Sequence, residues 1–306
     1  MKIVMTGATG FVGMNLMPLL LKETDANNEY LTLNRDVEKA NRLYPIKQYN
    51  NFTHVSTLDF QSLKDFNPDI VIHLATMSTS RNDLEIVHSL LETNIEFGVK
   101  FLNALKECPN FKLFVNVGTF AEYRYGNGKV NNAYLYSATK TAFRVFLDYY
   151  STLGKGFDYI TAVPYSVYGG KMTIKRLFDY MKDSIGATEP VDMTAGEQVL
   201  DFIHVDDVAR FFVYVINHCD EFIGMSKTEN EFHLGTGKGT SVREVAALME
   251  QIAGKHCNIN WGGRPYRDTD VMYSVAPIGQ NYNCGWTAIV DLKSGVEQFL
   301  KEKKRK

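Results

Sequence analysis

Three glycines near the start of the chain restrict its fold more than any other feature. Gly7, Gly10 and Gly13 follow one another at G-x-x-G-x-x-G spacing, directly after a short apolar run that contains Ile3 and Val4. An apolar run without polar alternation predicts a strand that is buried on both faces. Glycines also mark ordinary turns. Here a strand precedes them and a helix-length apolar segment follows, which favours a turn that binds nucleotide phosphates at a helix N-terminus.

Composition sets the outer limits on the kind of protein. The 306 residues are 45% hydrophobic, which is enough for a large core and about two domains. The formal net charge of -2 gives no sign of a nucleic-acid surface. No apolar stretch is long enough to span a bilayer. The glycine turn begins so close to Met1 that we expect no signal peptide.

Cysteine and histidine spacing bears on the compartment and on metals. The four cysteines are far apart and form no C-x-x-C pair, which predicts a reduced, cytoplasmic protein. The seven histidines show no ligand-like spacing, so we expect no metal site. One of them, His73, ends an apolar run, and we interpret it as a structural residue of a strand end.

The end of the second strand bears on the choice of cofactor. Residues 30–33 read as that strand, about 20 residues after the glycine turn, where a carboxylate commonly binds the adenosine ribose of NAD. This chain has Asn34 there, followed by Arg35. Loss of the anion and gain of a guanidinium favour the 2′-phosphate of NADP. The alternative is that Arg35 is an exposed loop residue and that Asp36 contacts the ribose of NAD.

The residues that suit catalysis follow a later strand. Residues 111–117 read as a strand, and Thr119 comes after it, where parallel sheets bind their ligands. Tyr136 and Lys140 are four apart at the start of an apolar helix, so they share one face. We expect the ammonium of Lys140 to lower the pKa of the Tyr136 phenol, and Thr119 to polarise a substrate oxygen. Y-x-x-x-K alone is common and uninformative; its combination with Thr119 and the glycine turn indicates a catalytic site.

These motifs resemble those of the extended short-chain dehydrogenase/reductases, in the nucleotide-sugar epimerase/dehydratase branch. The resemblance covers nearly the whole chain. The matching positions, in order, are 6–13 (TGATGFVG), Asp59, 73–75 (HLA), Asn94, Thr119, Tyr136, Lys140, 201–209 (DFIHVDDVA), 232–237 (FHLGTG), Ser241, 264–265 (RP) and 285–286 (GW). The resemblance implies an NAD(P)-dependent enzyme that binds a nucleotide-sugar and has no nucleic-acid or membrane partner.

The resemblance also implies the architecture. It is an α/β fold, a Rossmann-type doubly wound parallel sheet with a smaller C-terminal α/β substrate domain. Residues 1–165 would form the dinucleotide-binding domain, with 200–218 and 231–240 returning to it, and 166–306 would hold the nucleotide-sugar. Two helices, one with Asn94 and one with Tyr136 and Lys140, would pair across a two-fold axis, so a homodimer is expected.

Roles for individual residues follow from the same resemblance. Thr119, Tyr136 and Lys140 would be the catalytic residues. The residues expected to bind the cofactor are Gly7, Thr9, Gly10, Phe11, Val12, Asn34, Arg35, Asp59, Phe60, Leu74, Ala75, Thr76, Asn94, Tyr136, Lys140 and Pro164. Those expected to bind the substrate are Met77, Thr119, Phe120, Tyr165, Ser166, Arg264 and Arg267. Either of the two arginines would clamp the substrate diphosphate, although surface salt bridges explain each equally well.

Departures from the family pattern narrow the reaction. The 4,6-dehydratases have Asp-Glu after the catalytic threonine, whereas this chain has Phe120 and Ala121. Val163, Ser166 and Leu200 replace the Arg, Asn and Arg that many relatives carry. Residues 115–120, 134–140, 263–267 and 271–272 resemble the CDP-abequose and CDP-paratose synthases, which reduce a 4-keto group with NADPH. That subgroup implies a 4-ketoreductase of polysaccharide biosynthesis.

Two other functions remain open from the sequence. A nucleotide-sugar 4-epimerase would use the same three residues and retain tightly bound NAD through its cycle. A non-enzymatic NADP-binding sensor is also compatible with such a fold, because fold does not determine function. Sensors of this kind usually lose the tyrosine or the lysine, and this chain keeps both.

Overall fold

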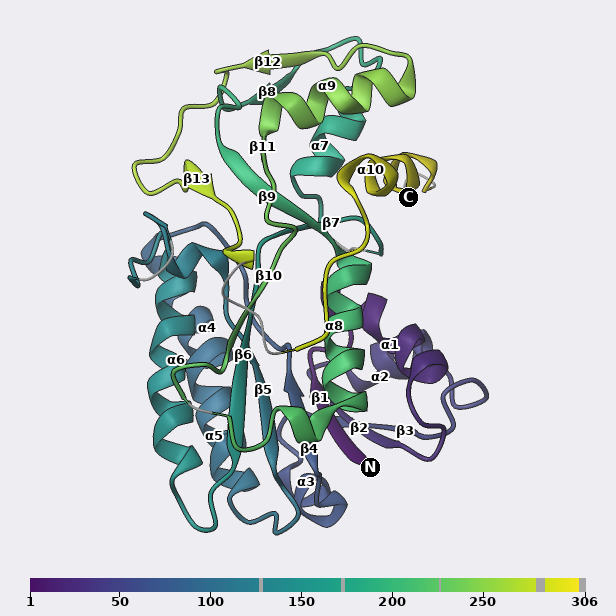
Figure 1. Ribbon diagram of the computed structural model, residues 1–306, viewed down its shortest axis with the longest axis vertical. Helices are drawn as coiled ribbons and strands as arrows, with labels where there is room; N and C mark the ends of the chain where they lie inside the picture. The colour runs from purple at the N-terminus through teal and green to yellow at the C-terminus, as the bar shows by residue number, and fades with distance from the viewer. Residues whose placement is uncertain (127–128, 172–173, 226, 279–283, 303–306) are drawn as a thin grey trace.

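The main sheet of the protein is a seven-stranded parallel sheet in the order β10-β6-β5-β4-β1-β2-β3 (Figure 1). The computed structural model describes residues 1–126, 129–171, 174–225, 227–278 and 284–302. The strands are β1 (Lys2–Thr6), β2 (Glu29–Asn34), β3 (Phe52–Ser56), β4 (Ile70–His73), β5 (Leu113–Val117), β6 (Asp158–Pro164) and β10 (Glu231–Leu234). The predicted Rossmann-type α/β fold is confirmed.

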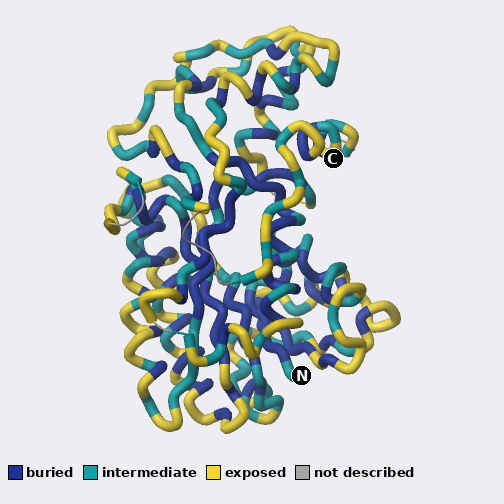
Figure 2. Tube along the Cα trace, in the orientation of Figure 1, coloured by how far each residue is buried: buried dark blue, intermediate teal, exposed yellow. Residues whose placement is uncertain are grey.

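Helices cover both faces of this sheet because side chains alternate along each strand. Ile3 and Met5 pack on the side of α1 (Phe11–Glu23) and α8 (Val205–Asn217). Val4 packs on the opposite side, toward α3 (Phe60–Phe66), α5 (Phe97–Leu105) and α6 (Leu135–Ser151). Figure 2 shows the resulting layer of buried strands between the two sets of helices.

A further hydrophobic cluster, separate from the two on the faces of the main sheet, forms the core of the C-terminal part, which lies above the sheet in Figure 1. It contains α7 (Leu177–Ser184), α9 (Val242–Ala253) and α10 (Leu292–Lys301). Its four-stranded sheet has β7 (Ser166–Tyr168), β9 (Val199–His204), β11 (Gly239–Ser241) and β13 (Tyr273–Ser274). Strands β8 (Val191–Met193) and β12 (Ile259–Trp261) pair separately. Two short helices, α2 (Val37–Leu43) and α4 (Val87–Leu91), belong to the part of the chain that forms the main sheet.

The two segments expected to return to the first domain are divided between the sheets. Strand β10 is the edge of the main sheet, and α8 packs against α1. Strands β9 and β11, however, belong to the four-stranded sheet of the C-terminal part. The chain thus crosses between the two sheets where β9 leads into α8, and again where β10 leads towards β11.

The glycine turn depends on close backbone contacts. Gly7 has a φ of 75°, and a Cβ atom there would lie 2.7 Å from the Ala75 nitrogen. A Cβ on Gly13 would lie 2.3 Å from the carbonyl oxygen of Gly7. Any larger residue at these two positions therefore pushes α1 away from β1 or the turn away from β4.

The helix expected to carry Asn94 is not α-helical around that residue. It continues from α4 through a π-helical turn, Glu92–Glu96, into α5. Single π turns inside helices are frequent at functional sites. Among the described residues, no helix combines the length and the hydropathy that crossing a membrane requires.

Candidate functional site

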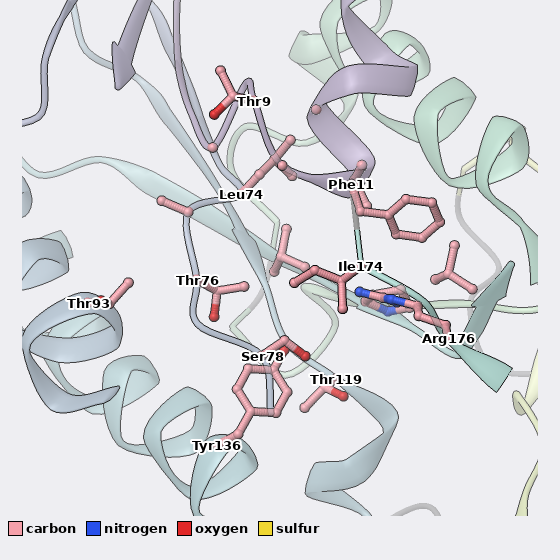
Figure 3. A pocket seen from close by; sticks show the side chains of 18 of the residues that line it. Thr9, Phe11, Leu74, Thr76, Ser78, Thr93, Thr119, Tyr136, Ile174 and Arg176 are labelled. Carbon is pink, nitrogen blue, oxygen red and sulfur yellow. The ribbon is translucent and has the colours of Figure 1, made fainter. Parts of the chain in front are cut away.

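A pocket of about 930 Å³ lies between the main sheet and the C-terminal part. The glycine turn and the residues after β2, β4 and β5 form one wall. Residues around the start of α7, together with Leu200, Phe202 and Phe299, form the other. Figure 3 shows Phe11 and Arg176 from the two walls side by side, with Thr119, Ser78 and Tyr136 below them. The pocket lies at the carboxyl ends of the parallel strands, where such sheets bind ligands.

Most of the residues predicted from the sequence line this pocket. From the cofactor group, those that line it are Gly7, Thr9, Gly10, Phe11, Val12, Asn34, Arg35, Leu74, Ala75, Thr76, Tyr136 and Pro164. From the substrate group they are Thr119, Phe120, Tyr165 and Ser166. Asp59, Phe60, Met77, Asn94, Lys140, Arg264 and Arg267 do not line it.

The residues outside the lining have other contacts. Asp59 caps α3 by accepting from the Ser62 backbone N–H at 3.0 Å. Arg267 lies 3.7 Å from Asp270, whose carboxylate accepts a hydrogen bond from the Tyr134 hydroxyl at 2.9 Å. The contacts of Asp59 are therefore within the start of α3, and those of Arg267 are with Asp270, outside the lining of the pocket.

Asn94 supports the pocket wall from behind. Its side-chain oxygen accepts from the Met77 N–H at 2.8 Å and from the Thr76 hydroxyl at 3.1 Å. Its side-chain nitrogen donates to the Thr139 hydroxyl at 2.9 Å. The π turn that carries Asn94 thereby fixes the loop after β4 to the helix of Tyr136. Asn94 is 4% exposed, so these bonds are protected from water.

The Tyr136 phenol is the polar group at the centre of the pocket floor. The side chains of Ser78 and Thr76 hydrogen-bond to it and favour its ionised form, but burial outweighs them and raises its pKa to about 12. The charge of Glu122 also raises this pKa, whereas that of Arg176 lowers it. Tyr136 therefore carries its proton at neutral pH.

Lys140 differs from the expectation that its charge tunes Tyr136. Lys140 follows Tyr136 by about one helical turn but is only 4% exposed and lies behind the pocket lining. Burial lowers its pKa from 10.5 to about 8, although the charge of Glu122 raises it. The predicted fall in the pKa of the phenol is therefore wrong for this structure, because burial dominates the pKa of both side chains.

Thr119 is held by the buried carboxylate of Glu122. The Thr119 N–H donates to Glu122 Oε1 at 2.9 Å, and the hydroxyl of Thr119 accepts from the Ala121 N–H at 3.3 Å. Glu122 also receives the Thr141 hydroxyl at 3.0 Å and the Arg144 guanidinium at 3.0 Å. These contacts fix Thr119 on the wall next to the helix of Tyr136.

His73 has the structural role expected of it. Its Nδ1 lies 3.0 Å from the Thr6 hydroxyl, which accepts from the Ala75 N–H at 3.0 Å. Burial among aromatic rings, with the charge of Lys140, lowers the pKa of His73 to about 3. A neutral imidazole thus joins the ends of β1 and β4. In the described part of the chain, no group of three or more His, Cys, Asp or Glu side chains could hold a metal ion.

The lining fits a dinucleotide in three respects. The φ of Gly7 and the tight contact at Gly13 keep the turn free of side chains, so a phosphate can approach the backbone. No side chain of a described residue caps the N-terminus of α1, which leaves its N–H groups for an anion. The buried side-chain oxygen of Asn34 has no hydrogen-bond partner among the described residues and can accept from a ribose hydroxyl.

Several pocket residues were missed by reasoning from sequence, and Ser78, Lys39 and Arg176 are three of them. Ser78 belongs to a loop of small residues after β4, and that position was a usable signal. Lys39 faces the pocket from the first turn of α2, three residues after the cap Asp36. Arg176 enters from the C-terminal part, and nothing in its sequence context indicated that it would meet the glycine turn.

The class of protein follows from a match to a family. The sequence model of the NAD dependent epimerase/dehydratase family matches residues 3–225, which is most of the chain. The chain therefore belongs to this family and is an NAD(P)-dependent enzyme.

The individual relatives share only about a quarter of their residues with this chain. CDP-abequose synthase of Yersinia pseudotuberculosis is 27% identical over 276 residues, covering 89% of this chain and 91% of the relative. CDP-abequose synthase of Salmonella muenchen is 25% identical over 304 residues, covering 99% and 98%. The solved structure of UDP-glucuronic acid 4-epimerase from Bacillus cereus, in complex with UDP-glucuronic acid and NAD, superposes with a TM-score of 0.82 at 21% identity, covering 98% of both chains.

Lys140 leads to a prediction about stability and pH. Its folded-state pKa of about 8 lies below the ordinary value of 10.5. Between pH 8 and pH 10.5 the unfolded chain binds more protons at Lys140 than the folded protein does, so the free energy of unfolding rises with pH. The burial of the charged Lys140 therefore destabilises the folded protein most below pH 8. Lys140→Met should therefore raise the free energy of unfolding at pH 7, by at most about 3 kcal/mol, and by much less at pH 10. Urea unfolding at both pH values measures the difference.

Lys106→Met is the control for this comparison, because Lys106 is exposed on the same side of the sheet. Its stability relative to the parent should not change between pH 7 and pH 10. A Lys140→Met protein that is less stable than the parent at pH 7 would contradict the assignment of a costly buried ammonium.

Proposed function

We propose that this enzyme reduces the 4-keto group of a nucleotide-activated deoxysugar with NADPH, the substrate being a CDP-4-keto-3,6-dideoxyhexose or a close analogue. The nicotinamide supplies the hydride when the cofactor is bound. The observation that carries the proposal is that Tyr136 and Thr119 line the pocket side by side at the carboxyl end of β5 (Figure 3). The CDP-abequose synthases among the relatives support the choice of sugar and base.

The chain's own residues have separable tasks in this reaction. Tyr136 Oη donates a proton to the sugar oxygen as negative charge develops there, since its pKa of about 12 keeps it protonated. The Thr119 hydroxyl donates a hydrogen bond to the same oxygen. Hydrogen bonds from Ser78 and Thr76 to Tyr136 favour the phenolate left after the transfer. Lys140, about one helical turn after Tyr136 and behind the lining, is proposed to act on the bound cofactor rather than on the pKa of the phenol.

The surroundings of Thr119 favour reduction over elimination of water. Dehydration needs both an acid and a base near the sugar. The two residues after Thr119 are Phe120 and Ala121, and the next, Glu122, is fully buried and already accepts from Thr119, Thr141 and Arg144. This carboxylate is engaged in structure and cannot reach a sugar in the pocket.

Tyr136→Phe tests the role of the phenol. The variant keeps the ring and its packing but removes the proton, so kcat should fall by about 10²- to 10⁴-fold while the affinity for NADPH stays within a few-fold of the parent. The assay follows NADPH absorbance with a CDP-4-keto-3,6-dideoxyhexose. Tyr125→Phe, at an exposed tyrosine outside the pocket lining, serves as the matched control and should keep parent kcat.

The same assay separates the alternative functions. A reductase consumes one NADPH for each sugar, whereas a 4-epimerase interconverts two reduced sugars without net consumption of the cofactor. A sensor binds NADPH but neither oxidises it nor converts the sugar. Near-parent kcat in the Tyr136→Phe variant would refute the mechanism even if the sugar is reduced.

We propose NADPH as the preferred cofactor because two cations line the pocket beyond β2. Arg35 and Lys39 both reach it next to Asn34, where a 2′-phosphate on the adenosine ribose would lie. Arg35→Ala and Lys39→Ala should each weaken NADPH binding by about 10-fold and leave NADH binding nearly unchanged. Arg42→Ala, one turn further along α2, is the control. Equal affinity of the parent for both cofactors, measured by fluorescence titration, would refute this preference.

We also propose a homodimer through the outer faces of α4 and α6. Val145 is 69% exposed, Phe146 38% and Tyr149 58%, and Leu91 on α4 is 44% exposed. A single apolar stripe of this kind on a helix favours a partner helix. Val145→Asp should convert the dimer to a monomer in light scattering at micromolar concentration, whereas Leu43→Asp on α2 should not. A parent protein that is monomeric at that concentration would exclude this assembly.

A further inference from the structure

Charge in the pocket is distributed unevenly between its two walls. The cationic residues that line it are Arg35, Lys39, Lys100 and Arg176. Arg35 and Lys39 lie beyond β2, and Lys100 pairs with Glu96 at 2.6 Å. Arg176 is the cation contributed by the C-terminal part, and the nearby Asp179 carboxylate interacts with its charge while accepting a hydrogen bond from its backbone N–H. An anionic ligand on that side therefore has one guanidinium available to it.

The rest of that wall is mostly apolar; it also contains Asp179, whose carboxylate accepts a hydrogen bond from the backbone N–H of Arg176 at 3.0 Å. Leu177, Phe178, Leu200, Phe202 and Phe299 line the pocket around Arg176. Phe178 and Phe202 also belong to the hydrophobic cluster of the C-terminal part, which fixes the start of α7. A mostly apolar wall with one cation can hold a base and a sugar against its side chains, but it offers positive charge to a phosphate only at Arg176.

The position of Arg176 connects the two walls. Its guanidinium lies over the ring of Phe11, 4.6 Å from the centroid, and Phe11 is the first residue of α1 after the glycine turn. Its charge is also close enough to Tyr136 to lower the pKa of the phenol. Figure 3 shows Arg176 and Phe11 together, above Thr119 and Tyr136. A group bound at Arg176 thus lies between the glycine turn and the Tyr136 hydroxyl.

We infer that Arg176 binds the diphosphate of the nucleotide-sugar substrate, in the place that reasoning from sequence gave to Arg264 or Arg267. This inference rests on the proposed function. Two diphosphates must fit in the pocket, and the uncapped N-terminus of α1 serves the one carried by the cofactor. The planar guanidinium of Arg176 serves the other, because its N–H donors match two phosphate oxygens at once. Arg264 and Arg267 are exposed outside the lining.

Calorimetric binding of CDP and of cytidine tests this inference, with NADPH measured in parallel. Arg176→Ala should weaken CDP binding by about 10- to 100-fold while cytidine and NADPH change by less than about 3-fold. Arg176→Lys keeps the positive charge but loses the planar guanidinium that can donate to two phosphate oxygens at once, so its CDP affinity should lie between those of Arg176→Ala and the parent. Lys175→Ala is the matched control: Lys175 is the neighbouring residue, pairs with Asp183 and does not line the pocket.

The possible outcomes separate this inference from the proposed function. Parent and Arg176→Ala proteins that bind CDP equally would overturn the role of Arg176 and leave the proposed function intact. Loss of NADPH binding with CDP binding retained would assign the guanidinium to the cofactor and also overturn the inference. A parent protein that binds none of CDP, UDP, GDP and dTDP would refute the proposed function and, with it, this role of Arg176.

Discussion

The carboxylate of Glu122 joins the elements that carry the site. It is fully buried, and it accepts hydrogen bonds from the backbone after β5 and from two side chains of α6. Arg144, the second of those side chains, also pairs with Glu231 on β10. Breaking a buried ion pair by removing one partner typically costs about 3–5 kcal/mol. The relative position of Thr119 and the helix of Tyr136 therefore depends on Glu122 and Arg144 together, because removal of Arg144 leaves the buried carboxylate of Glu122 without its ion-pair partner, and removal of Glu122 leaves Arg144 paired with Glu231 alone.

This network also controls the protonation of the site. The negative charge of Glu122 raises the pKa of Tyr136 and that of Lys140. For the phenol, burial acts in the same direction, so Tyr136 remains a proton donor at neutral pH. For the amine, burial opposes Glu122 and prevails, so the ammonium of Lys140 is retained at a cost to stability. Residues that suit catalysis here are thus not those that would give the most stable fold.

Sequence reasoning succeeded where a local pattern fixes the local structure. The glycine turn, the alternation of strands and helices, and the helical spacing of Tyr136 and Lys140 all follow from contacts within a few residues. It failed where the outcome depends on packing between distant segments. The pKa of Tyr136 depends on its burial and on hydrogen bonds from the loop after β4, and the contact of Arg176 with Phe11 joins residues 165 positions apart in the sequence. The π turn around Asn94 likewise has a helix-like sequence.

The pocket exists because the hydrophobic clusters on the two faces of the main sheet and the cluster of the C-terminal part do not close over the ends of the strands. Main-sheet residues bury their side chains against the helices on either face, and those of the C-terminal part pack around α7, α9 and α10. The space between them, about 930 Å³, is near the upper end of ordinary ligand pockets. A cofactor bound at the glycine turn covers only the first wall. In the proposed reaction, a nucleotide-sugar against the other wall would then exclude water from the space between the walls, and hydrogen bonds from Tyr136 and Thr119 to the sugar oxygen would be stronger there than in water.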